Sequence, residues 1–182
     1  MSTSELHMPG AGNGGGSTDH EQHPSDGGYS PHEHRPLAGY AAMTGIFGTG
    51  LGGALLALRA SGHELPERLE ASDVLLIGVA SHKLSRMATK DKATSFLRAP
   101  FTRFQENAGH AEVSEEPRGS GARRAIGELL ICPYCLAQWI TAAMALGIVA
   151  APRQTRFLAS IYSALTISDF LQLAYRAGEE RV

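Results

Sequence analysis

The sequence predicts an all-α protein: a small polytopic helical membrane protein with three to four spans, a C-terminal helical hairpin and a disordered N-terminal tail. Three observations predict this class. Uncharged apolar runs have the length of membrane-crossing helices. The cations gather in one central stretch, as they do in a cytoplasmic loop. The first part of the chain, residues 1–36, is too polar and too rich in glycine to join a core.

The N-terminal tail, residues 1–36, combines Gly, Ser, Pro and His with few apolar side chains, which follow neither a strand nor a helix period. We therefore expect disorder there. Its histidines could bind a divalent metal weakly, but a solvated tail is the favoured interpretation, because an unstructured chain must order every ligand it recruits. The chain does not start with a basic segment and an apolar run, so we expect no cleaved signal peptide.

Residues 37–60 form the first apolar segment, a Gly-rich helix without a charged side chain between Leu37 and Leu58. This length suffices to cross a bilayer. Gly48 and Gly52 have the four-residue spacing that lets two membrane helices approach closely. A phosphate-binding loop would need a strand before these glycines, and no strand pattern precedes them.

The second segment, residues 73–88, starts apolar and becomes amphipathic, which predicts a short or shallow span. Residues 89–128 follow as a charged loop that contains Pro and Gly and no run able to cross a membrane. Nine of the 16 Lys and Arg residues lie between Lys83 and Arg124. By the positive-inside rule this basic loop is cytoplasmic.

Two more apolar segments follow, residues 129–151 and 157–175, and the turn between them contains Pro152. They predict an antiparallel hairpin that completes a helical membrane domain over residues 71–175. Four crossings of the cell membrane place both termini in the cytoplasm, and three crossings are the fallback. The expected partners are the lipid bilayer and a second copy or another membrane protein. The net charge of −2 does not suggest nucleic acid.

Cys132 and Cys135 lie where the loop meets the third apolar segment, with Pro133 between them. A three-residue helical offset puts both sulfurs on one face, and a helix N-terminus lowers the pKa of a thiol. Pro133 suits an early helical position. Three roles stay open: interfacial packing, thiol redox chemistry, and a zinc half-site completed by a second chain, His82 or His110. No other cofactor is predicted.

Asp169 lies within the last apolar segment, where an ionisable side chain is a functional-site hypothesis by default. A structural ion pair with Arg86 or Lys83 is the favoured interpretation. Proton or ion handling and a position near the interface are the alternatives. Tyr134 and Trp139 are amphipathic aromatic residues of the kind found at membrane boundaries.

The order of the motifs resembles a known family. The matching positions are residues 73–86, Leu97-Arg98-Ala99-Pro100-Phe101, residues 127–135 and Trp139. They are similar to the bacterial membrane-protein family catalogued as domain-of-unknown-function family 1360, some of whose members are labelled sporulation proteins. The resemblance covers about residues 70–175 and implies an integral membrane protein of undetermined activity, without a known substrate, cofactor or catalytic residue. It implies the signature positions Arg86, Arg98, Pro100, Cys132, Cys135 and Trp139.

The leading functional hypothesis is a non-catalytic scaffold or assembly factor organised around the cysteine motif on the cytoplasmic face. One alternative is a membrane-bound thiol oxidoreductase in which Cys132 attacks and Cys135 resolves. The other is a dimer bridged by zinc.

Overall fold

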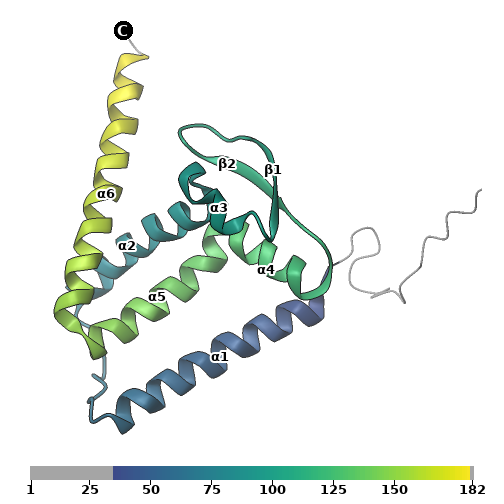
Figure 1. Ribbon diagram of the computed structural model, residues 1–182. Coiled ribbons are helices and arrows are strands. Elements are labelled where there is room, and N and C mark those ends of the chain that lie inside the picture. The colour runs from purple at the N-terminus through teal and green to yellow at the C-terminus, as the bar shows by residue number, and fades with distance from the viewer. Residues whose placement is uncertain (1–34, 181–182) are drawn as a thin grey trace, which may run out of the picture. The chain divides into compact units, whose positions relative to one another are not determined.

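The computed structural model describes residues 35–180, so the tail that we expect to be disordered lies outside the described residues except at its last two positions. The helices are α1 (Leu37–Ala60), α2 (Ala71–Lys90), the 3-10 helix η1 (Lys92–Thr94), α3 (Ser95–Arg98), α4 (Gly121–Ile131), α5 (Pro133–Ala150) and α6 (Pro152–Glu179). A hairpin of β1 (Thr102–Asn107) and β2 (Val113–Pro117) lies between α3 and α4 (Figure 1).

Three helices in the described part, α1, α5 and α6, are long and apolar enough to cross a membrane. The bounds of α1 coincide with the predicted Gly-rich helix at residues 37–60. The 20-residue helix α2 does not join them, because its second half is rich in polar side chains. Three described helices thus have the length and composition to cross a membrane, and a fourth crossing by α2 stays a prediction.

The buried core lies where α2 meets α5 and α6. Its fully buried apolar residues are Ile77, Ala80, Met144, Ile148 and Ala159. Ala80 and Ala159 are inaccessible to solvent, and such small side chains let α2 and α6 approach closely. The core is therefore centred on α2, against which both α5 and α6 pack.

Hydroxyl side chains of α6 add hydrogen bonds to α2. Ser163 Oγ donates to the carbonyl of Leu76 at 3.0 Å, and Thr166 Oγ1 donates to the carbonyl of Val79 at 3.3 Å. Hydroxyl groups commonly join helices in this way inside membranes, where no water competes for the bond. These two contacts explain why Ser163 and Thr166 interrupt the apolar sequence of α6.

Helix α1 contacts α4 and α5, but not through the glycines that we expected. Within the described part of the chain, no atom outside the helix lies within 4 Å of a Cβ built on Gly48 or Gly52. Gly39 makes the close approach instead, because its Cβ would lie 2.7 Å from the Cβ of Ala125 on α4. The prediction of close packing at Gly48 and Gly52 is therefore wrong for contacts inside this chain.

The chain is mostly helical, but the all-α prediction misses the hairpin inside the basic loop. Its strands pair antiparallel from Thr102 opposite Pro117 to Asn107 opposite Val113. Among the strand residues only Thr102 and Val113 are buried. A ribbon that buries so few side chains lacks the alternation of apolar and polar residues from which a strand is predicted.

The third and fourth apolar segments begin and end at other residues than predicted. The helix expected over residues 129–151 is broken at Cys132, where α4 has ended and α5 starts with Pro133. The turn expected at residues 151–156 is reduced to Ala151, because α6 starts at once with Pro152. Proline excludes the helical conformation from the residue before it and is favoured at the first helical position, so both breaks have the same cause.

Candidate functional site

The two cysteines form a close pair at the start of α5. Their Cα atoms are 5.3 Å apart and their sulfur atoms are in direct contact. Cys132 caps α5, since its Sγ accepts a hydrogen bond of 3.2 Å from the backbone N–H of Cys135. Cys135 is exposed, and between the two cysteines Tyr134 is 89% exposed. This arrangement can hold the pair as a dithiol or as a disulfide, and a reagent can reach it.

The histidines expected as further metal ligands lie elsewhere. His82 on α2 and His110 in the hairpin turn line a pocket to which neither cysteine belongs. Among residues 35–180, no three His, Cys, Asp or Glu side chains gather closely enough to hold a metal ion. A zinc ion at Cys132 and Cys135 would therefore need ligands from outside residues 35–180, and this role stays a prediction.

Arg98 is the centre of a buried polar network, although the sequence suggested no partner for it. Its side chain is 1% exposed and pairs with Glu115 of β2, whose side chain is 5% exposed. Two guanidinium nitrogens reach the carboxylate at 2.8 and 3.1 Å. Nη1 donates to the carbonyl of Ala88 and the hydroxyl of Thr94, and Nη2 donates to the carbonyl of Asp91 as well. One side chain thus joins the end of α2, η1, α3 and the hairpin.

The residues after Arg98 attach the hairpin to α4. The carbonyl of Pro100 accepts hydrogen bonds from the guanidinium of Arg123 at 3.1 and 2.5 Å. The carbonyl of Phe101 approaches Gly127 so closely that a Cβ there would lie 2.6 Å from it. Pro100 therefore belongs to a contact between two segments, which sequence analysis could not specify without knowing that α4 lies beside it.

Trp139 lies on α5 and packs edge-on against Phe47 of α1, with ring centroids 5.1 Å apart.

At the other end of the bundle, the Arg156 guanidinium at the start of α6 binds the Asp73 carboxylate of α2 with hydrogen bonds of 2.7 and 2.8 Å. Asp73 is buried. The sequence analysis named Trp139 for its type and missed the pairing of Asp73 with Arg156.

A pocket of about 830 Å³ lies between α2, α6 and the hairpin turn, and polar and apolar residues share its lining. Asp169 pairs there with Lys83 at 2.6 Å, which is one of the two partners expected from the sequence. Arg86, the other expected partner, instead binds Glu112 of the hairpin turn through contacts of 2.6 to 3.1 Å. The predicted positions Arg86 and Asp169 thus line one pocket, whereas the cysteine pair lies outside it.

Comparison with known proteins finds a family that matches the part of the chain containing this pocket and the cysteine pair. A family described as "Protein of unknown function (DUF1360)" matches residues 76–175, which extend from α2 into α6 and include the hairpin and the cysteine pair. The "UPF0713 protein YngL" of Bacillus subtilis (strain 168) is 28% identical over 115 residues, which cover 62% of this chain and 85% of that protein. No solved structure matches the chain.

Proposed function

The chain belongs to the DUF1360 family of proteins of unknown function, and we propose that it is a non-catalytic membrane scaffold or assembly factor. Its helices α1, α2, α5 and α6 carry a platform made of the hairpin and α4. The observation that carries this proposal is the buried network of Arg98 and Glu115, which attaches the hairpin to the end of α2. An exposed element that is held in place before binding loses little conformational freedom when another protein binds to it.

The direction of the helices supports a multi-pass arrangement. In Figure 1, α1 and α5 run away from the end that carries the platform, and α2 and α6 run towards it. The nine cations between Lys83 and Arg124 belong to the platform end. The opposite end carries Arg59, Arg68, Arg153 and Arg156. The positive-inside rule then favours a cytoplasmic platform and four crossings, with the buried face of α2 against α5 and α6.

Membrane residence and sidedness can be measured together by fractionation and thiol labelling. In a background that lacks both native cysteines, Glu106→Cys places a thiol on the exposed part of the hairpin, and Glu64→Cys places one in the exposed loop between α1 and α2. We expect both variants in the membrane fraction. A membrane-impermeant maleimide should label Glu64→Cys in spheroplasts, and Glu106→Cys only after lysis.

Two results would contradict the proposal. The reverse labelling pattern would show that the platform faces outward. Recovery of the chain as a soluble monomer without detergent would show that α1, α5 and α6 pack into a water-soluble bundle and do not insert into a membrane.

The second candidate function is thiol redox chemistry, and the contact between the two sulfur atoms favours it. In that reaction the Cys132 thiolate attacks a substrate disulfide and releases one substrate thiolate. The Cys135 thiolate then attacks the mixed disulfide, which releases the second substrate thiolate and leaves the Cys132 and Cys135 disulfide. The substrate gains two electrons and the pair loses two, so a separate thiol reductant must restore it.

The thiol pKa and the reduction potential of the purified chain distinguish the two functions. The scaffold predicts that replacing both cysteines by serine leaves partner binding and membrane assembly intact. A thiol pKa near the ordinary value of about 8.5 would exclude the redox function. A strongly lowered pKa, together with rapid exchange with glutathione, would instead favour it over the scaffold.

A further inference from the structure

The lining of the pocket between α2, α6 and the hairpin turn contains three Lys or Arg side chains and three Asp or Glu side chains. Two of its carboxylates are already occupied, because Asp169 binds Lys83 and Glu112 binds Arg86. The third, Asp91, accepts a hydrogen bond of 2.8 Å from a backbone N–H at the start of η1. The acidic side chains of the lining therefore have partners inside the protein.

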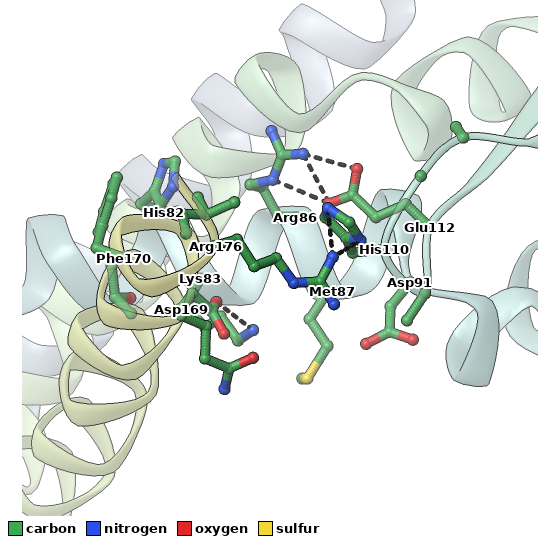
Figure 2. A pocket seen from close by; sticks show the side chains of 16 residues that line it. His82, Lys83, Arg86, Met87, Asp91, His110, Glu112, Asp169, Phe170 and Arg176 are labelled. Atoms are coloured by element: carbon green, nitrogen blue, oxygen red, sulfur yellow. Dashed lines mark hydrogen bonds and ion pairs between the residues drawn. The ribbon is translucent and has the colours of Figure 1, made fainter. Parts of the chain in front are cut away.

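Arg176 is the exception in this lining. Among residues 35–180 it has no carboxylate within ion-pair distance, and its Nη1 instead contacts the two ring nitrogens of His110 at 2.5 and 2.9 Å. Figure 2 shows Arg176 extending from α6 to His110, beside the pair of Arg86 and Glu112. Because an arginine only donates hydrogen bonds, the ring of His110 accepts this one, and the Nε and Nη2 groups of Arg176, which make no hydrogen bond within the described residues, can donate to an anion.

Apolar side chains form another part of the lining, which also contains Thr166 and Gln172. Met87 of α2 and Phe170 and Leu173 of α6 form part of the wall, and the ring of Phe170 stacks on His82 with centroids 6.4 Å apart. Apolar side chains beside cationic groups match a ligand with a charged head and an apolar body. The pocket also lies where α2 and α6 approach the basic platform, which in the proposed arrangement is the cytoplasmic surface of the membrane.

We propose that this pocket binds a phosphate group, with the Arg176 guanidinium as the main ligand and His110 as the residue that positions that guanidinium. Arginine presents a planar fork of donors that matches two phosphate oxygens. The group can belong to the head of an anionic phospholipid or to a small soluble phosphate. Only the lipid source rests on the proposed membrane location, because the soluble source requires the pocket alone.

The experiment uses the full chain purified in a neutral detergent. Its binding is titrated with inorganic phosphate, with glycerol phosphate, and with micelles doped with phosphatidylglycerol or, as the zwitterionic control, phosphatidylcholine. Arg176→Gln removes the main ligand at an exposed position, and Arg103→Gln is the matched control on the exposed face of β1. Native mass spectrometry gives the number of bound molecules, and thermal unfolding gives the affinity.

We expect one phosphate-bearing molecule per chain and an affinity at least about tenfold lower for Arg176→Gln, because a charged hydrogen-bonded pair is lost. Arg103→Gln should bind like the native chain. His110→Gln should weaken binding less than Arg176→Gln. Preference for phosphatidylglycerol identifies the lipid source, and equal binding of glycerol phosphate identifies the soluble source.

The proposal is overturned if none of the phosphate compounds binds, or if Arg176→Gln and Arg103→Gln weaken binding equally. The second result would mean that phosphate is attracted by the charge of the whole platform. The test with soluble phosphate does not depend on membrane residence, so its outcome and that of the labelling experiment are independent.

Discussion

Arg98 provides the sharpest test of how the platform is held. Arg98→Met keeps much of the side-chain volume but removes the charge and every hydrogen bond of the guanidinium. The Glu115 carboxylate, 5% exposed, then stays buried without its cation. Breaking a buried pair in this way costs about 3–5 kcal/mol. The carbonyls of Ala88 and Asp91 lose their donor as well, so we expect the upper part of that range.

Hydrogen exchange of the hairpin amides, in detergent, measures this loss where it occurs. A decrease of about 3–5 kcal/mol in the local free energy of opening speeds exchange in β1 and β2 by roughly two to four orders of magnitude. Arg103→Met is the matched control, because Arg103 lies on the same hairpin but is exposed. The double variant Arg98→Met with Glu115→Leu removes both charges and should recover most of the loss.

Either of two results would refute this reasoning. If Arg98→Met exchanges as slowly as Arg103→Met, the network does not hold the hairpin. If the double variant is as unstable as Arg98→Met alone, the unpaired carboxylate is not the source of the loss, and the backbone carbonyls are.

Two further variants test the contacts between segments, both by thermal unfolding in the same detergent. Gly127→Ala places a Cβ 2.6 Å from a backbone carbonyl, so we expect a loss of about 1–3 kcal/mol. Gly178→Ala on α6 meets no neighbour and should be neutral or stabilising. If Gly178→Ala and Gly127→Ala change the unfolding midpoint equally, the close approach of Phe101 to Gly127 is contradicted. Arg156→Ala leaves the buried Asp73 carboxylate unpaired and should lower the unfolding midpoint. Arg153→Ala is the control at the start of the same helix, because Arg153 is exposed and has no ion pair in the described part, and it should leave the unfolding midpoint unchanged. If both variants lower the midpoint equally, the pair of Arg156 and Asp73 does not stabilise the fold.

The long apolar helices were predictable because their cause is local. The charge-free composition of residues 37–58 already identifies a helix that favours lipid, and α1 has the predicted bounds. The first residues of α5 and α6 were harder to predict. Pro133 and Pro152 determine where these helices start, but the sequence analysis placed the boundaries by the continuous apolar runs and not by the prolines.

The hairpin and the partners of the signature residues could not be predicted in the same way. β1 and β2 are stabilised by each other and by Arg98, and their own residues are mostly polar. The composition of residues 102–117 is therefore that of a loop. The choice of Lys83 over Arg86 as the partner of Asp169 depends on the hairpin turn, since Glu112 occupies Arg86.

The sequence by itself predicted a mostly helical chain, its long apolar helices, its basic segment and the place of the cysteine pair at the start of a helix. These features follow from composition and from the backbone preferences of proline. Only the tertiary structure decided that Arg98 is buried with Glu115, that Gly39 and not Gly48 makes the close approach of α1, and that Arg176 meets His110 in a pocket. Each of these depends on residues far apart in the chain, and their distances are set only when α2 packs between its neighbours.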